Sequence, residues 1–227
     1  MSILDWDIYV DFPGNLLIFT DTAAPEIGTG SLAFGHINTV DFTHANLVPT
    51  DDSAGLSHGV APNGRLRTVC RVDIHEGGTP LISYFGVTAL QSQDDLTAGG
   101  SCYALLLASG EGLVDPVLCL HKFTSGLPNG LPTPPLISIP FPVTLGVPFA
   151  MELEWIVDVP NLGGTFLLAR TGTQTDFSDL TAQMSFVDTS SPITTSVAEG
   201  VVASFKSNSV SDTKKVIFDN TTLFELT

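Results

Sequence analysis

Asp5-Trp6-Asp7-Ile8-Tyr9-Val10-Asp11-Phe12 is the stretch of sequence that decides the fold. Apolar side chains alternate in it with acidic residues and a tyrosine, so that Trp6, Ile8, Val10 and Phe12 share one face. A period of two is typical of a β-strand with one buried face. The turn residues Pro13-Gly14-Asn15 and a second apolar run over residues 16–19 follow, and together these segments predict a β-hairpin.

Strand-length segments of the same kind recur to the end of the chain, separated by clusters of Gly, Pro, Asn, Asp and Ser. They are residues 32–37, 66–74, 81–90, 102–108, 117–123, 149–157, 165–169, 197–205 and 216–226. Many short strands with turn signals are typical of a sandwich or barrel. Only residues 176–184, with Phe177, Leu180 and Met184 at helical spacing, predict a helix. We therefore expect an all-β fold, a two-sheet antiparallel jelly-roll sandwich with at most one short helix, as a single domain over residues 1–227.

A proline-rich segment at about residues 124–148 interrupts the series of strands. Seven of the fifteen prolines of the chain lie between Pro128 and Pro148, and proline removes the N–H donors that a sheet needs. The segment is therefore expected to be an extended loop over the sandwich, or alternatively an arm that reaches a neighbouring subunit. The second interpretation rests on apolar residues that are costly to leave in water, which are Leu136, Ile137, Ile139, Phe141 and Val143.

The charge of the chain is strongly negative, with 24 acidic against 8 basic residues and a net charge of −16. Such a chain repels phosphate backbones and anionic lipid, so we expect neither a nucleic acid nor a membrane as partner. The first basic residues, Arg65, Arg67 and Arg71, fall on one side of a predicted strand. They predict a patch that docks an acidic neighbour, including another copy of this protein. The alternative is a solvated strand face balanced by nearby carboxylates such as Asp73.

Acidic side chains on one strand are the candidate catalytic residues of this sequence. Glu152, Glu154 and Asp158 fall on one face of a predicted strand, and laminarinase-like sandwich glycosidases place paired carboxylates in this way. The Glu-x-Asp-x-Glu pattern of those enzymes is absent, so a solvated polar face is favoured. The sequence also contains no GxSxG motif, no P-loop and no dinucleotide-binding glycine pattern. We expect no catalytic residue and no enzymatic activity.

Cofactor and redox expectations follow from the remaining residue types. Cys70, Cys102 and Cys119 lack metal-ligand spacing, which favours three reduced thiols inside strands. The acidic pairs Asp51-Asp52 and Asp94-Asp95 lie in predicted loops and offer oxygen ligands of the kind that Ca²⁺ takes. No cofactor is expected, with Ca²⁺ as the alternative. The first twenty residues lack the pattern of a secretory signal, which predicts synthesis in the cytoplasm.

Most of residues 80–227 resembles a known fold family. Residues 199–205 (Glu-Gly-Val-Val-Ala-Ser-Phe), followed by the Phe218-Asp219-Asn220 strand, resemble the closing strands of concanavalin A-like (laminin-G/lectin-type) sandwiches. Residues 102–107, 117–123 and 149–158 resemble the central run of strands in that family. The resemblance implies that the final strand pairs close to the N-terminal strands. Members of the family include lectins, carbohydrate-binding modules, glycosidases and virion proteins of bacteriophages.

Two functions therefore remain open. The first is a non-enzymatic structural protein of a virus particle, a capsid decoration, cement or tail component of a tailed bacteriophage. Such a protein is made in the host cytoplasm without a signal peptide, is localised in the virion, and acts through contacts with other virion proteins and with its own copies as a homo-oligomer. The second is a carbohydrate-binding lectin-like module or a laminarinase-like glycoside hydrolase, with a glycan as partner.

Overall fold

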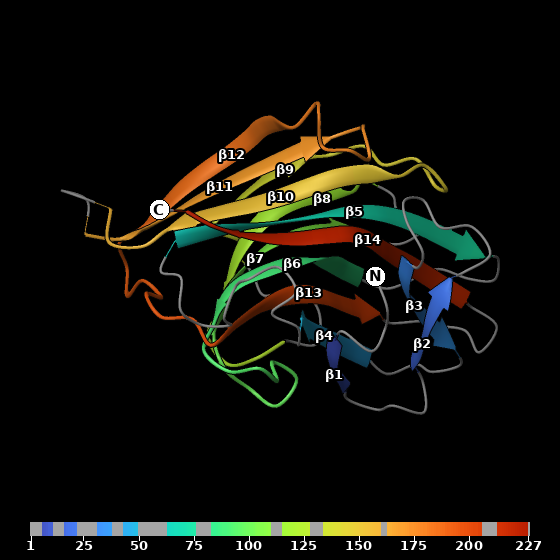
Figure 1. Cartoon of the computed structure of the whole chain (residues 1–227), viewed down its shortest axis with the longest axis horizontal. Helices are drawn as coiled ribbons and strands as arrows, with labels where there is room; N and C mark the ends of the chain where they lie inside the picture. Colours follow the sequence, from blue (N-terminus) through green and yellow to red (C-terminus); the bar gives the residue numbers. More distant parts are fainter. Residues whose placement is uncertain are drawn as a thin grey trace.

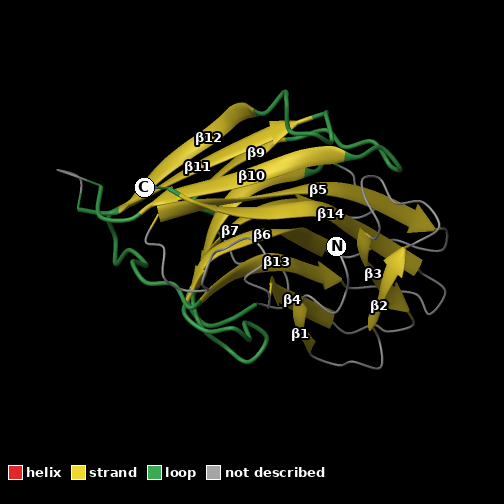
Figure 2. Ribbon diagram, in the orientation of Figure 1, coloured by secondary structure: helices red, strands yellow, loops and turns green. Residues whose placement is uncertain are grey.

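Two antiparallel sheets make up the structure, a computed structural model that describes residues 6–10, 16–21, 31–37, 43–49, 63–75, 83–109, 115–127, 134–159, 163–205 and 213–226. The described residues form fourteen strands and no helix (Figure 2). Every strand pair is antiparallel, as the sequence predicted. No helix in this part of the chain is long and apolar enough to cross a membrane.

Each sheet has seven strands (Figure 1). Sheet A contains, in spatial order, β1 (Trp6–Val10), β4 (Thr43–Pro49), β13 (Ala198–Phe205), β6 (Ser83–Gln91), β7 (Cys102–Ser109), β8 (Val117–Phe123) and β9 (Ile137–Pro140). Sheet B contains β12 (Thr181–Asp188), β11 (Thr165–Gly172), β10 (Phe149–Ile156), β5 (Asn63–His75), β14 (Thr213–Glu225), β3 (Ser31–Ile37) and β2 (Leu16–Asp21). In Figure 1 sheet B runs from β12 at the top to β2 at the lower right.

The main core lies between the sheets and is built from alternate residues of their strands. Sheet B contributes Leu66, Leu153, Trp155 and Phe218, and sheet A contributes Leu105 and its neighbours, all buried in one apolar cluster. Burial of each large apolar side chain is worth about 1.5–3 kcal/mol. Alternation along residues 149–157 directs Trp155 inward, on the face opposite Glu152 and Glu154, and Trp155 is 1% exposed.

Sheet A is also buried on its outer face. Tyr84, Leu106 and Phe123 form a second apolar cluster there, joined by Leu96 and Leu127 from two loops. These loops are held together by hydrogen bonds that Leu127 N–H donates to Leu96 O (3.0 Å) and Gly126 N–H to Gly100 O. The central strand β7 is therefore buried on both faces, which explains why its sequence is continuously apolar. Its residues from Cys102 to Ala108 are at most 2% exposed.

His121 is a titratable group inside this outer layer. Its side chain is 2% exposed and its ring stacks on Phe123 with centroids 5.6 Å apart. The Nε2 atom has no hydrogen-bond partner among the residues that the structure describes. Burial lowers the pKa of His121 to about 4, because desolvation disfavours the imidazolium ion.

The three cysteines are buried free thiols, as predicted, on β5, β7 and β8. Burial raises the pKa of Cys70 and of Cys102, and raises that of Cys119 to about 12. Each therefore behaves as a small apolar side chain.

The predicted N-terminal hairpin is wrong. β1 pairs with β4 in sheet A, whereas β2 pairs with β3 in sheet B, so the chain changes sheets between Val10 and Leu16. Alternation establishes that a segment is a strand with one buried face, but both sheets offer such a face, and the pattern does not select the partner. The strands β4, β9 and β12 were not predicted as strands. The final strand β14 pairs with β3 and β5, close to the N-terminal strands as the resemblance implied.

The helix predicted over residues 176–184 is also wrong. Its apolar residues serve two separate faces: Phe177 and Leu180 lie in a small cluster with Val69 and Ala150 on the outer face of sheet B, whereas Met184 joins the main core. One helix cannot present its residues to both sides of a sheet. Instead a turn brings the chain around the sheet edge, and strand β12 begins at Thr181.

Side-chain hydrogen bonds stabilise that turn. Asp179 accepts bonds from Thr173 N–H (2.8 Å) and Gln174 N–H (3.0 Å), and Asp176 accepts one from Ser178 N–H. Hydrogen bonds from the side chain and the N–H of Ser178 lower the pKa of Asp176, and those from Gln174 and Thr173 lower the pKa of Asp179. Phe177 between them adopts a positive φ of 64°. Aspartates that cap their own backbone compete with helix formation, which explains the failure of the helical spacing.

The proline-rich segment contains the short edge strand β9. Ile137 lies opposite Leu120 and Ile139 opposite Leu118, and Leu136, Phe141 and Val143 pack, partly buried, against the main core. The segment thus covers this chain's own core, which supports the interpretation as a layer over the sandwich. A contact of Leu136, Ile137, Ile139 and Phe141 with a neighbouring subunit stays a prediction, as does the single domain over residues 1–227.

We expect Gly86→Ala to destabilise the fold by about 3 kcal/mol or more, because a Cβ at this position would lie 2.0 Å from the carbonyl oxygen of Leu105 on β7. Gly163→Ala is the control: it has nothing within 4 Å, so only its positive φ of 62° opposes alanine, at a cost of about 1 kcal/mol. Urea unfolding measures both. Equal losses would show that the β6–β7 approach is not tight.

We expect His121→Leu to weaken the pH dependence of the free energy of unfolding below neutral pH. The pKa of His121 is depressed in the folded protein, so the unfolded chain binds more protons once the pH falls below about 6.5. Wild-type protein therefore loses up to about 3 kcal/mol from this group as the pH falls toward 4. Urea unfolding at neutral and acidic pH measures the slope, and identical slopes in both proteins would contradict the assignment.

Candidate functional site

The outer face of sheet B brings several of the sequence-predicted residues together. Alternation along β10 directs Glu152 and Glu154 away from the core, while Leu153 and Trp155 point into it. Asp158 does not join them, because it lies beyond the end of β10 with a positive φ of 52° and is exposed. The predicted trio of carboxylates is therefore a pair.

These two carboxylates are not the solvated face that the sequence favoured. Glu152 is only 2% exposed, and the Glu154 side chain is 16% exposed. A carboxylate in such surroundings needs a cation or hydrogen bonds. Arg170, on the adjacent strand β11, supplies both: its Nη1 lies 2.5 Å from Glu152 Oε1 and 2.7 Å from Glu154 Oε2. Burial alone would lower the pKa of Arg170, but these two partners outweigh burial and raise it.

Arg67 and Arg65 lie on β5, the strand that flanks β10 on the side opposite Arg170. In the strand register Arg67 is opposite Glu152, which is in turn opposite Arg170. Arg65 is opposite Glu154 one step along. The sheet thus carries a row of alternating charges across β11, β10 and β5. Burial lowers the pKa of Arg67, the Glu152 charge opposes this, and the neighbouring Arg65 charge adds to the lowering.

Two phenylalanines position these guanidinium groups. Arg65 and Arg67 both lie over the ring of Phe224 on β14, at 4.7 and 4.5 Å, and Arg67 also lies over Phe177 at 4.3 Å. Stacking of this kind favours the cation and restricts its rotamers. Neither Arg65 Nε nor Arg67 Nε has a hydrogen-bond partner in the described ranges.

All four arginines of the chain consequently share one face of one sheet. We call Arg65, Arg67, Arg71 and Arg170 the arginine face. Arg71 belongs to it because it alternates with the core residues Cys70 and Val72 on β5. The sequence predicted the three arginines of β5. It missed Arg170, Phe177 and Phe224, because pairing across strands, and not spacing along one strand, brings them to the site.

Glu152 and Glu154 do not have the arrangement of a glycosidase pair. In that mechanism one carboxyl group holds a proton for the leaving group while the other attacks or activates water, on opposite sides of the bond to be cleaved. Here both carboxylates accept hydrogen bonds from the same nitrogen atom of Arg170. One cation therefore holds the two of them together as acceptors.

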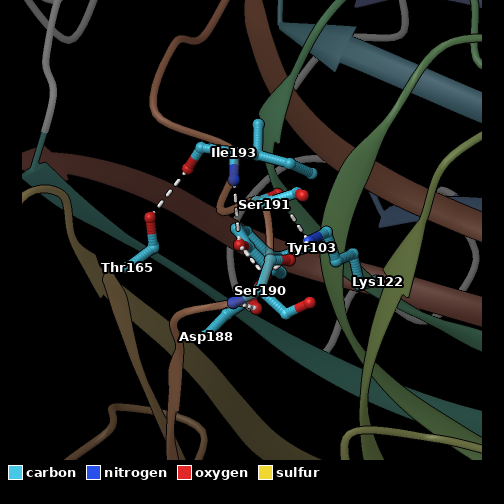
Figure 3. Close-up of polar contacts among 7 residues, drawn as sticks. All are labelled: Tyr103, Lys122, Thr165, Asp188, Ser190, Ser191 and Ile193. Atoms are coloured by element: carbon cyan, nitrogen blue, oxygen red, sulfur yellow. Dashed lines mark hydrogen bonds and ion pairs between the residues drawn. The ribbon is translucent and has the colours of Figure 1, made fainter. Parts of the chain in front are cut away.

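A second polar cluster joins the two sheets (Figure 3). Asp188, at the end of β12, accepts hydrogen bonds from Tyr103 Oη of β7 (2.5 Å) and from Lys122 Nζ of β8 (2.6 Å). Lys122 also donates to the carbonyl oxygens of Ser190 and Ser191, both at 2.7 Å. Burial alone would raise the pKa of Asp188, but the hydrogen bonds from Lys122, Tyr103 and Ser190 N–H outweigh it, and the pKa is lowered.

This cluster has the residue types of an acid–base site but not the access. Tyr103 is fully buried and burial raises its pKa, and its hydroxyl also accepts a hydrogen bond from Ile193 N–H (3.0 Å). The three hydrogen bonds of Lys122 use all the donors of an ammonium group. The cluster therefore acts as an interlock between sheets A and B.

A pocket of about 490 Å³ lies where the β9–β10 connection meets the turn between β11 and β12. Phe141, Val143, Val147 and Phe149 supply apolar walls, with Thr181 and Gln183 on the polar side. Leu145 and Val147 in this connection are 47% and 51% exposed. The pocket is separate from the arginine face, and the sequence did not predict it.

Metal ligands do not gather in the described part of the chain, where no group of three His, Cys, Asp or Glu side chains could hold an ion. Asp95 accepts hydrogen bonds from the hydroxyl and the N–H of Thr97, at 2.5 and 2.9 Å, and so caps its own loop. Asp51-Asp52, the other acidic pair that suggested Ca²⁺, lies outside the described residues.

Solved structures with the same arrangement of strands define the class to which this fold belongs. The chain is similar to an endo-β-1,4-glucuronan lyase from the fungus Trichoderma reesei, with a TM-score of 0.59 and 10% identity over 99% of this chain and 92% of that one. It is also similar to a legume lectin-like domain from Entamoeba histolytica, with a TM-score of 0.54 and 11% identity over 99% and 92% of the two chains.

A third similar structure is the exoplasmic/lumenal domain of VIP36 in its Ca²⁺/Man3GlcNAc-bound form, with a TM-score of 0.53 and 11% identity over 100% and 86% of the chains. No protein-family model and no curated protein matches the sequence. The chain therefore has the concanavalin A-like, legume-lectin-like β-sandwich fold that the resemblance implied. Identities of 10–11% show the fold, and function has to be argued from the site.

We expect Asp188→Asn to destabilise the protein by about 2–3 kcal/mol, because it leaves the Lys122 ammonium without its carboxylate partner. Asp158→Asn removes the same charge at an exposed position, where asparagine tolerates the positive φ, and is expected to change stability by about 0.5 kcal/mol or less. Thermal unfolding compares the two. Similar small effects would show that the interlock contributes little.

Proposed function

We propose that this protein is a non-catalytic carbohydrate-binding module that binds its ligand on the outer face of sheet B, at the arginine face. The observation that carries the proposal is the gathering of all four arginines with Phe177 and Phe224 on one side of one sheet. The fold supports it, because VIP36 and the Entamoeba domain are lectin-like and the VIP36 structure is a glycan-bound form.

The chemistry of the arginine face suits a sugar. Arg65 and Arg67 are partly exposed cations with several N–H donors, and Glu154, with 16% of its side chain exposed, is an acceptor beside them. Sugar hydroxyl groups both donate and accept, so a surface that offers donors and acceptors side by side matches them. The stacked rings hold these groups in place before a ligand arrives, which reduces the entropy cost of binding.

The same contacts argue against hydrolysis at this face. A general acid has to hold a proton at the start of the reaction, whereas Glu152 and Glu154 are both engaged as acceptors of one guanidinium nitrogen. The lyase among the similar structures shows that the fold is compatible with an enzyme, but the proposal of a binding module rests on the site.

A structural protein of a bacteriophage particle stays a prediction. An arginine face on a chain with a net charge of −16 also suits an acidic protein surface, including that of a second copy. Localisation in the virion and contacts with other virion proteins belong to that prediction. The similar structures described above are lectin domains and a lyase, and we therefore give carbohydrate binding priority.

A glycan array tests the proposed function. We expect wild-type protein to bind a subset of glycans, and Arg67→Gln to lose about 10-fold or more in affinity for them, because a charge-assisted hydrogen bond is worth about 1.5–3 kcal/mol. Asp158→Asn, an exposed position beyond the end of β10 and outside the arginine face, is the control that retains affinity. Repeating the binding in EDTA tests whether a bound Ca²⁺ takes part.

Two outcomes would count against this proposal. Absence of binding to every glycan, with the protein folded and found with particles in its native source, would favour the virion interpretation. Release of reducing ends or unsaturated sugars from a bound polysaccharide, lost in Glu152→Gln, would show an enzyme in place of a binding module.

A further inference from the structure

The cations of the arginine face are not all paired with carboxylates. Glu152 and Glu154 are both bonded to Arg170. Arg65 and Arg67 lie next to these carboxylates in the register, but no ion pair joins them to a carboxylate in the described part of the chain. Arg65 and Arg67 therefore present positive charge on a protein whose net charge is −16.

The geometry of Arg67 determines how a ligand can reach that charge. Its guanidinium group lies over the rings of Phe177 and Phe224, at 4.3 and 4.5 Å. Rings that stack on a guanidinium group occupy its broad faces, whereas its N–H groups lie in its plane and point outward from the edge. A ligand is therefore bound through the edge, and a planar anion with two oxygens fits that edge with two parallel hydrogen bonds.

Arg65 lies two residues from Arg67 on the same face of β5, with its guanidinium group over the same Phe224 ring. Two cations beside each other repel, and burial and the Arg65 charge both lower the pKa of Arg67 while the Glu152 charge opposes them. An anion that lies between their edges relieves this repulsion.

From these contacts we infer that the arginine face selects glycans that carry a sugar carboxylate, with the carboxylate bound at the edges of Arg65 and Arg67 and the ring hydroxyl groups directed to Glu154. This inference rests on the proposed function and names its ligand class. The charge of −16 opposes a long, densely charged polymer, so the ligand is an oligosaccharide with one or a few acidic sugars. The negative charge of Glu154 disfavours a ligand that carries a second carboxylate close to the one bound by the arginines.

The test compares uronic-acid oligosaccharides with the same oligosaccharides after chemical reduction of the carboxyl groups to alcohols. Calorimetry on wild-type protein is expected to give at least about 10-fold tighter binding to the acidic form, because reduction removes the charge-assisted pair. Arg65→Gln and Arg67→Gln are expected to lose this preference. Arg67→Lys keeps the charge but not the fork of donors, and is expected to lose most of it.

Other results would overturn the inference and can be told apart from failure of the proposed function. Equal affinity for acidic and reduced forms, or preference for sulfated over carboxylated sugars, would refute carboxylate selection while glycan binding stands. Failure to bind any of these glycans would refute both. A wild-type dimer that becomes a monomer in Arg67→Gln, measured by light scattering without any glycan, would assign the face to a second copy. Thermal unfolding of each variant establishes that it is folded.

Discussion

The burial of one face of each sheet against the other is the constraint on which this structure depends. Trp155, Phe218 and Leu105 meet in the layer between the sheets, and every strand that supplies such a residue must direct its alternate residues outward. The two outer faces then become chemically independent of the core. On sheet A the outward residues are apolar and covered, whereas on sheet B they include the charged row around Glu152. One rule of alternation thus produces a structural face and a candidate binding face.

The charged row shows how a sheet can hold acidic groups that are nearly out of contact with water. Glu152 is 2% exposed, a position that a lone carboxylate would occupy only at a cost of several kcal/mol. Arg170 meets it from one neighbouring strand and Arg67 faces it from the other. Because every second residue of β10 and β5 returns to the same face, the next pair along, Glu154 and Arg65, repeats the arrangement. The row is a consequence of register as much as of composition.

The sequence predicted properties that belong to a single strand and failed on those that depend on partners. Alternation placed Trp155 inward and the arginines of β5 on one face, because side-chain direction follows from position along a strand. It could not show that residues 6–10 and 16–21 enter different sheets, since any half-apolar strand fits either. Helical spacing at Phe177, Leu180 and Met184 was misleading, because a turn around a sheet edge distributes three apolar residues over two faces. Arg170 joins the site only because β11 pairs with β10, and the sequence pattern along one strand contains no information about its partner.

The pairing of β14 with β5 has a consequence for how the protein folds. β5 ends at His75 and its partner in the middle of sheet B begins at Thr213, so the middle of that sheet stays incomplete until these two distant segments meet. Closing so long a loop is slow, and contacts between distant segments delay folding. Until β14 has joined the sheet, the hydrogen-bonding edge of β5 stays open. During that interval an unpaired strand edge is exposed to other copies of the protein.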